Sequence, residues 1–201
     1  MEDGSKKLAK QKFAIILLGD SNVGKTAIFN RCINNKFEEN NNASIGVEFS
    51  TKTYTYQDKD YSLQIFDTAG EERFRCITQS YYHLGEGAFI IFDLTNKDTL
   101  ESVKIWLKDI EEANNNNTKL IILGNKNDLK EEHKIPDDEI NDFLSEFNIK
   151  FFKVSAKDGS NIEEAIYQMI DLLVNDSIDV SIKERIKSKN LKGKKNMDKC
   201  C

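Results

Sequence analysis

The fold is decided by Gly19-Asp20-Ser21-Asn22-Val23-Gly24-Lys25-Thr26, which occupies residues 19–26. Its spacing is G-x-x-x-x-G-K-[ST], and it stands between an apolar run of strand length, 13–19, and a helix-like run, 26–34. Glycines let the backbone bend so that successive N–H groups point inward at the start of a helix, where they bind an anion. The stretch therefore predicts a phosphate-binding loop, called the phosphate loop below.

The residue types in the phosphate loop predict separate tasks. Lys25 would place its ammonium near the outer phosphates of a nucleotide, and Thr26 would supply a hydroxyl to Mg²⁺. Asn22 lies on the rim of the loop, where we expect a left-handed backbone conformation. The nucleotide-binding set predicted from this segment is Asp20, Ser21, Asn22, Val23, Gly24, Lys25, Thr26 and Ala27.

Apolar runs of strand length alternate with amphipathic runs of helix length on either side of this loop. The pairs, strand first, are 13–19 with 26–34, 88–94 with 99–112, 120–124 with 137–147, and 151–154 with 162–174. Such alternation predicts a mostly parallel sheet with helices on both faces.

Residues 47–66 break this pattern. Two strand-like runs, 47–56 and 61–66, flank Gln57-Asp58-Lys59-Asp60 and predict a β-hairpin, hence one antiparallel edge strand. The predicted fold class is α/β, a doubly wound, mostly parallel six-stranded sheet of the P-loop NTPase type with five helices.

Asn125-Lys126-Asn127-Asp128 follows the strand-like run 120–124 directly. The carboxylate of Asp128 can accept two hydrogen bonds, from N1–H and the exocyclic amine of guanine. Adenine offers neither donor and would leave the charge unpaired, which is costly when the charge is buried. Asp128 therefore predicts guanine, and the alternative is an ordinary polar loop. An ATP-using P-loop kinase is disfavoured because it would give these residues no purpose. Ser155-Ala156-Lys157 follows the last strand at the same sheet edge and completes the predicted base site with Asn125 and Lys126.

Asp67-Thr68-Ala69-Gly70 follows another strand end, residues 63–66. In parallel α/β sheets ligands bind at this carboxyl edge. Asp67 can hold Mg²⁺ through water, and Gly70 can turn its amide toward a γ-phosphate. The alternative is a strand-to-loop turn with an incidental acid.

Composition limits the class of protein. The chain has 201 residues, 31% of them charged, and 39% hydrophobic, which fits one soluble domain with a tail. Its longest apolar runs, 14–18 and 88–92, are far shorter than the ~20 residues of a membrane span. With no apolar stretch of signal-peptide length before residue 13, we expect a cytosolic protein.

The C-terminus differs in charge from the rest of the chain. Residues 183–199 carry +6, so the remainder carries −11 of the net −5. An acidic body argues against nucleic-acid binding, and a basic tail favours an anionic membrane. Cys32 and Cys76 stand alone, whereas Cys200 and Cys201 are the last two residues and are predicted sites of lipid attachment. A merely solvated tail is the alternative.

With these segments in this order and at these separations, the chain resembles the Ras superfamily of small GTPases over residues 12–175. Residues 1–11 would be an N-terminal extension and 176–201 a flexible basic tail ending in a prenylation site. Within the superfamily the chain resembles the Rab proteins. The sequences that look Rab-specific are Ile45-Gly46-Val47-Glu48-Phe49, Ser62-Leu63-Gln64-Ile65-Phe66, Arg73-Phe74-Arg75-Cys76-Ile77, Tyr81-Tyr82 and Cys200-Cys201.

The resemblance implies a GTPase that switches between GTP and GDP. Ser44 and Gly70 would engage the γ-phosphate and order two loops, near 36–47 and 68–83, that relax after hydrolysis. Thr26, Ser44 and Asp67 would hold Mg²⁺, Phe37 would lie across the guanine edge, and Lys25, Gly70 and Glu71 would be catalytic. Effectors would contact Ile45, Gly46, Val47 and an exposed aromatic triad of Phe49, Phe66 and Tyr81, unless these aromatic residues are hairpin core.

Its implied partners are effector proteins, an exchange factor, a GTPase-activating protein, a GDP-dissociation inhibitor and a prenylation escort. Cys200 and Cys201 would carry geranylgeranyl groups, because two lipid chains anchor stably where one is marginal. The implied location is the cytoplasmic face of an intracellular membrane, in exchange with the cytosol, and the implied role is regulation of vesicle-mediated transport.

Three positions depart from the family pattern. Ser44 stands in place of the usual threonine, Phe66 in place of tryptophan, and Glu71 in place of the glutamine that orients the attacking water. A carboxylate cannot donate a hydrogen bond, and its charge would lie beside γ-phosphate oxygens. Two outcomes stay open: slow hydrolysis through repulsion, which would make the chain a GTP-dependent membrane scaffold, or unimpaired hydrolysis with Glu71 as acceptor or base. An activating protein that brings an arginine and a glutamine in trans could restore hydrolysis in either case.

Overall fold

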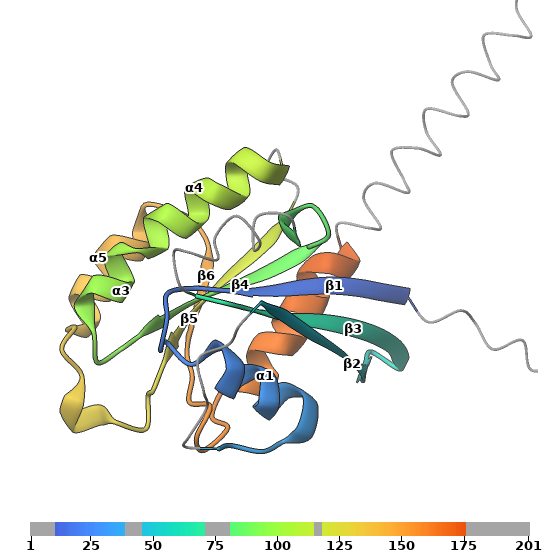
Figure 1. Ribbon diagram of the computed structural model, residues 1–201, viewed down its shortest axis with the longest axis horizontal. Coiled ribbons are helices and arrows are strands. Elements are labelled where there is room, and N and C mark those ends of the chain that lie inside the picture. The colour runs from blue at the N-terminus through green and yellow to red at the C-terminus, as the bar shows by residue number, and fades with distance from the viewer. Residues whose placement is uncertain (1–10, 39–45, 71–80, 115–117, 176–201) are drawn as a thin grey trace, which may run out of the picture.

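The computed structural model describes residues 11–38, 46–70, 81–114 and 118–175. Its centre is a six-stranded sheet in the order β2-β3-β1-β4-β5-β6 (Figure 1). The strands are β1 (Gln11–Leu18), β2 (Val47–Tyr56), β3 (Lys59–Thr68), β4 (Gly87–Asp93), β5 (Lys119–Asn125) and β6 (Lys150–Lys153). β2 and β3 pair antiparallel, and the other neighbouring strands pair parallel. The predicted fold class is confirmed.

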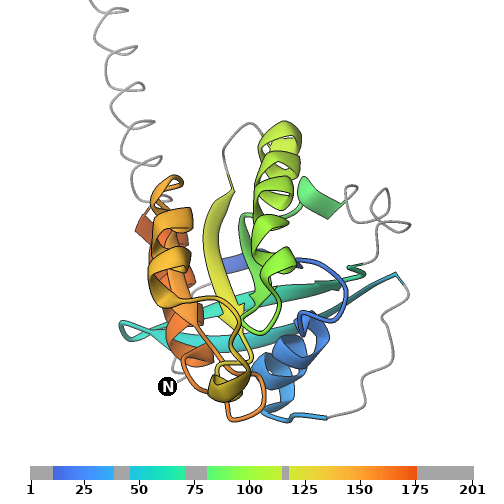
Figure 2. The same cartoon turned by 90° about the vertical axis from the view of Figure 1, so that its left-hand side faces the viewer.

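Helices cover both faces of the sheet. Besides a 3₁₀ turn at Lys130–Glu132, they are α1 (Lys25–Asn34), α3 (Lys97–Glu101), α4 (Val103–Asn114), α5 (Asp137–Ser145) and a helix over residues 162–175. α1 and the 162–175 helix lie on one side, and α4 and α5 lie on the other (Figure 1). In Figure 2 α4 and α5 run side by side, joined by an ion pair between Lys104 and Glu146 at 3.4 Å.

The prediction of a single helix over 99–112 is wrong in one detail. It is divided at Ser102 into α3 and α4, and the Ser102 hydroxyl donates to the carbonyl of Asp98 at 3.2 Å. The Ser102 amide donates to the same carbonyl at 3.1 Å, and a serine hydroxyl that shares the carbonyl of the preceding turn in this way bends a helix.

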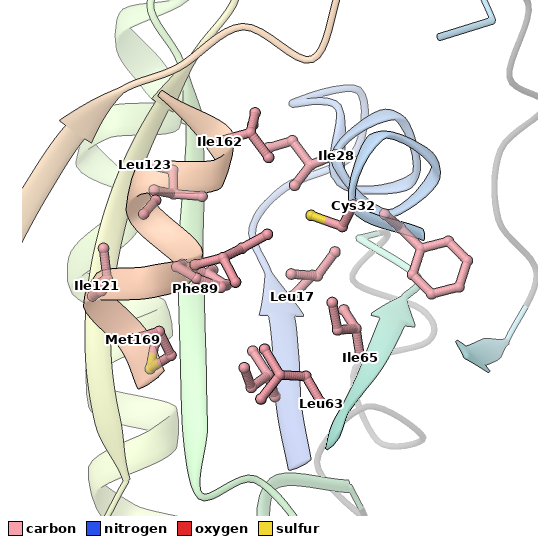
Figure 3. Packing of buried hydrophobic residues seen from close by; sticks show 14 of the residues in the cluster. Leu17, Ile28, Cys32, Leu63, Ile65, Phe89, Ile121, Leu123, Ile162 and Met169 are labelled. Carbon is pink, nitrogen blue, oxygen red and sulfur yellow. The ribbon is translucent and has the colours of Figure 1, made fainter. Parts of the chain in front are cut away.

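Each face of the sheet has its own hydrophobic core. On the α1 side, Ile28 and Cys32 of α1 and Ile162 and Met169 of the last helix point toward the strands (Figure 3). On the other side, buried residues of α4 and α5 pack on side chains such as Phe92. In the ranges that the structure describes, no helix is long and apolar enough to cross a membrane.

The β2–β3 hairpin is tighter than the sequence predicts. β3 begins at Lys59, so the turn is Gln57-Asp58 alone, with φ of 49° and 59°. Two successive residues with positive φ form a turn whose twist matches that of the paired strands. The turn thereby sets the register, in which Phe49 lies opposite Phe66.

The parallel register brings the candidate functional segments to one edge. Leu17 of β1 pairs with Asp67 of β3, and Asp93 of β4 pairs with Asn125 of β5. Because the carboxyl ends of parallel strands meet at the same edge of a sheet, the loops after these four strands gather there.

Replacement of Phe92 by alanine tests the second core. Phe92 is fully buried and stacks on Phe151 with ring centroids 5.9 Å apart. We expect Phe92→Ala to lower the free energy of unfolding by ~3–5 kcal/mol, because it removes buried surface and leaves a cavity. Urea unfolding followed by circular dichroism measures the loss.

The matched control is Phe49→Ala, since Phe49 is 58% exposed and contacts one ring, Phe66. We expect that variant to lose at most about 1.5 kcal/mol. Equal losses in the two variants would contradict the assignment of Phe92 to the core.

Candidate functional site

The phosphate loop connects β1 to α1 in the conformation that an anion nest requires. Gly19, Asn22 and Gly24 have φ of 144°, 63° and 95°. The left-handed conformation predicted for Asn22 is therefore confirmed. Gly24 caps α1 without a side-chain hydrogen bond, so the first amides of the helix face the loop.

Lys25 is buried within this loop. It is 6% exposed, and its Nζ donates to the carbonyl of Asp20 at 2.7 Å. Burial lowers the pKa of Lys25 to about 8, against the opposing charges of Asp67 and Asp20. A Cβ at Gly70 would lie 2.2 Å from Lys25 Nζ, so residue 70 leaves room for the ammonium only as glycine. A buried cation of this kind favours an anionic ligand.

Thr26 and Asp67 meet across the sheet edge. Thr26 Oγ1 donates to Asp67 Oδ2 at 2.7 Å, and Asp67 is 2% exposed. A hydroxyl and a carboxylate are the hard oxygen donors that suit Mg²⁺, which keeps several waters and takes few protein ligands. No group of three or more His, Cys, Asp or Glu side chains suited to a metal occurs in the described ranges. The Thr26–Asp67 pair therefore has the chemistry that fits Mg²⁺.

Asn125 joins the phosphate side of the site to the base side. Its Nδ2 donates to the carbonyl of Val23 at 2.9 Å, and its Oδ1 accepts from the amide of Ala156 at 3.1 Å. Asn125 is 2% exposed, and a Cβ at Gly24 would lie 2.4 Å from its Nδ2. Sequence reasoning placed Asn125 at the nucleotide; the structure makes it a tie between residues 19–26 and 155–157.

Asp128 lies where a base could meet its carboxylate. Its Oδ1 accepts from the hydroxyl of Ser155 at 2.6 Å, and the same hydroxyl accepts from the amides of Lys157 and Asp158. Ser155 is fully buried and Asp128 is half-buried. The carboxylate is therefore oriented by the protein while one side stays accessible.

Two polar contacts at this edge were not predicted. Lys126 Nζ forms an ion pair with Asp93 Oδ2 at 2.6 Å, and Trp106 Nε1 donates to Asp20 Oδ1 at 2.8 Å. Asp93 ends β4 at the same sheet edge as Asn125. An acidic residue at the end of a predicted strand was the sequence signal that could have identified Asp93. Nothing in the local sequence of Trp106 points to Asp20, which lies 86 residues away.

The remaining residues predicted to bind the nucleotide differ in how exposed their side chains are. Val23 and Ala27 point their side chains into the core, so only their backbone can reach a ligand. Ser21 is exposed, and Phe37 is half-buried against the core of the α1 face.

The three aromatic residues predicted as an exposed triad do lie together. Ring centroids are 5.4 Å apart between Phe49 and Phe66 and 6.0 Å apart between Phe66 and Tyr81. The expectation of exposure is wrong for Phe66, which is 5% exposed because it lies between the other two rings. Beside it, Gly46 accepts a hydrogen bond from the amide of Ala69 at 3.1 Å, which places Val47 at the start of the hairpin.

Five predicted site residues lie outside the described ranges. They are Ser44, Ile45, Glu71, Cys200 and Cys201.

Comparison with known proteins agrees with this geometry. The model of the Ras family matches residues 14–175. The chain is 39% identical over 176 residues to the Ras-related protein RABD2a of Arabidopsis thaliana, covering 88% of this chain and 82% of that protein. It is 38% identical over 158 residues to the GTP-binding protein ypt3 of Schizosaccharomyces pombe, covering 79% and 74%. It is 34% identical over 173 residues to the Ras-related protein Rab11D of Nicotiana tabacum, covering 86% and 78%.

Replacement of Asn125 by alanine tests the tie between the loops. The variant leaves the buried carbonyl of Val23 and the buried amide of Ala156 without their partner. We expect the free energy of unfolding to fall by about 3 kcal/mol, since each unsatisfied buried group is costly. Asn141→Ala, on the exposed face of α5, is the matched control and should change it by less than ~0.5 kcal/mol. Similar values for both variants in urea unfolding would refute the role given to Asn125.

Proposed function

The chain belongs to the Rab family of the Ras superfamily of small GTPases, and we propose that it recruits effector proteins in its GTP state to regulate vesicle-mediated transport. Its activity is hydrolysis of GTP to GDP and phosphate. The observation that carries the proposal is the meeting of three segments at one sheet edge: the phosphate loop, the pair Thr26–Asp67, and the Asn125-tied loops 125–128 and 155–157. Together they offer separate places for phosphates, metal and base.

The phosphate end of the nucleotide would lie on the loop amides. The ammonium of Lys25 is already directed along this loop by the carbonyl of Asp20, so it meets the outer phosphates without rearrangement. Thr26, Asp67 and, by resemblance, Ser44 would hold Mg²⁺, which neutralises charge on the β- and γ-phosphates when bound. Gly70 lies close enough to Lys25 for its amide to reach the same phosphate.

The guanine end would lie against Asp128 and residues 155–157. Since Ser155 orients the Asp128 carboxylate, the acceptors for N1–H and the exocyclic amine are preorganised. An adenine in that place would offer neither donor, and the carboxylate would keep its bond from Ser155 but gain none from the base, so we expect guanine nucleotide to be bound in the purified protein.

Effectors would read the segments that connect to the γ-phosphate. Phe49 presents an exposed ring on β2, supported from behind by Phe66, with Tyr81 half-buried on the other side. Such an aromatic patch suits protein recognition because rigid rings bury large areas at low entropic cost. Gly46 and Val47 border it, and Ile45 precedes them.

Glu71 decides how fast the switch turns off. If its charge repels the γ-phosphate, intrinsic hydrolysis is slow and the chain is a GTP-dependent scaffold; if Glu71 accepts a proton or hydrogen bond from water, hydrolysis proceeds. Both candidates place the same nucleotide in the same site.

Single-turnover hydrolysis separates the two candidates. Native chain and Glu71→Gln, each loaded with GTP, are compared with and without a GTPase-activating protein of the Rab-directed type. We expect the native chain to hydrolyse GTP slowly alone and much faster with the activator, because the activator supplies its own arginine and glutamine.

If the native chain cleaves GTP under neither condition while Glu71→Gln cleaves readily, the scaffold function holds instead. Adenine nucleotide in the purified protein would refute both candidates. Phosphate release and chromatography of the extracted nucleotide provide the two measurements.

The last 26 residues, 176–201, would supply the membrane anchor. The +6 charge of residues 183–199 contributes roughly 1 kcal/mol for each basic side chain near an anionic surface. Cys200 and Cys201 would add two lipid chains, which is the number needed for stable anchoring. This pair of signals supports our proposal that the protein is located on the cytoplasmic face of an intracellular membrane.

Cosedimentation with vesicles tests the anchor. We expect the prenylated chain to sediment with vesicles containing phosphatidylserine, and Cys200→Ser with Cys201→Ser to leave it in the supernatant. Cys32→Ser is the control, since Cys32 is buried in α1. Persistent binding by the double variant in physiological salt would contradict the account of the tail.

A further inference from the structure

Arg31 lies on α1 at the end opposite to the phosphate loop. It is six residues after Lys25, a rise of about 9 Å along the helix. Its guanidinium does not point back to the phosphates; it reaches the loop after β6, which is 125 residues away in the sequence.

The guanidinium holds two carbonyls of that loop. Arg31 Nε donates to the carbonyl of Ala156 at 2.9 Å, and Nη2 donates to the carbonyl of Lys157 at 2.5 Å. The amide of Ala156 is bound by Asn125. Ala156 is therefore held on both sides, by Asn125 through its N–H and by Arg31 through its C=O.

The position of the guanidinium is itself determined by its surroundings. Nη1 donates to the carbonyl and to the Oδ1 of Asn35, the left-handed residue that ends α1, at 3.1 Å and 3.2 Å. A Cβ at Gly159 would lie 3.7 Å from Cδ of Arg31, so the side chain lies along the backbone of the next turn of the loop. All three nitrogens of the planar group are thus engaged, a geometry that lysine cannot reproduce.

We propose that Arg31 is a positioning residue for the nucleotide, which holds residues 155–157 against α1 and thereby slows release of the bound guanine nucleotide. The inference rests on the proposed function, because these residues are taken to border the base. α1 then links both ends of the ligand: Lys25 and Thr26 at its start contact the phosphates, and Arg31 near its end secures the base loop. Without Arg31 the loop would keep its tie to Asn125 and lose two others, so it would open more often.

The effect on release can be separated from an effect on folding. Arg31 borders an open pocket together with Lys52, Tyr54 and Glu163. The bond to Lys157 is exposed and the bond to Ala156 is part-buried, so water can replace the guanidinium at the first carbonyl and the cost to folding is smaller than for two fully buried carbonyls. Their positions, which the nucleotide requires, would still be lost.

The test is the dissociation rate of GDP carrying a fluorescent N-methylanthraniloyl group, displaced by excess GDP in the presence of Mg²⁺. We expect release to be roughly tenfold faster from Arg31→Ala and intermediate from Arg31→Lys, whose ammonium can bond one carbonyl but not the full set. Single-turnover hydrolysis of bound GTP should be unchanged, because Arg31 is remote from the γ-phosphate.

Lys52→Ala is the matched control. Lys52 borders the same pocket and also donates to a carbonyl of α1, that of Cys32 at 2.6 Å, but not to the loop. The Lys52→Ala variant should release the labelled GDP at the native rate. Native-like release from both Arg31 variants, or equal acceleration by Lys52→Ala, would overturn the inference. A native chain that binds no guanine nucleotide would instead overturn the proposed function.

Discussion

The side-chain amide of Asn125 is the contact on which the rest of the site depends. It ends β5, and its two polar atoms bind Val23 in the phosphate loop and Ala156 after β6. Because the amide is buried, displacement of one loop alone would leave a polar group unsatisfied, and this cost couples the positions of the two loops. The same contact limits residue 24 to glycine, since a Cβ there would collide with the amide. Phosphate recognition and base recognition are therefore one structural unit.

The base end and the phosphate end of that unit are stabilised by different interactions. At the base end, Ser155 satisfies Asp128 and Asp93 satisfies Lys126, so the polar groups are paired before any ligand arrives. At the phosphate end, burial lowers the pKa of Lys25, and the charges of Asp67 and Asp20 offset that cost in part. A bound nucleotide relieves this cost, and a ligand that binds only the folded state also raises stability by mass action. The base end is thus preorganised, whereas the phosphate end is completed by its ligand.

The local sequence predicted the features of the fold that interactions between neighbouring residues determine. Apolar periodicity located every strand of the sheet. The phosphate-loop spacing predicted Asn22 and Thr26, and the end of the run 63–66 predicted Asp67, which Thr26 contacts. The local sequence did not predict contacts between distant residues. The Trp106–Asp20 bond and the Arg31–Ala156 bond join positions that are 86 and 125 residues apart. The type of a side chain alone does not identify its partner. The prediction that Phe66 is exposed was wrong for a related reason, because the burial of Phe66 depends on the rings that flank it.

The departures from the family pattern belong, by resemblance, to one functional part of the chain. Ser44, Phe66 and Glu71 belong, by resemblance, to the γ-phosphate and effector segments, whereas Asn125 and Asp128 on the base side match the family. In the described ranges, the side-chain hydrogen bonds of Asn125 and Asp128 join residues 23, 155 and 156 and do not involve Phe66. Substitution at 44 or 71 can therefore alter the lifetime of the GTP state while recognition of guanine stays intact. We therefore expect affinity for the nucleotide and the rate of the switch to be separable properties of this chain, and the positions that depart from the family pattern bear on the second.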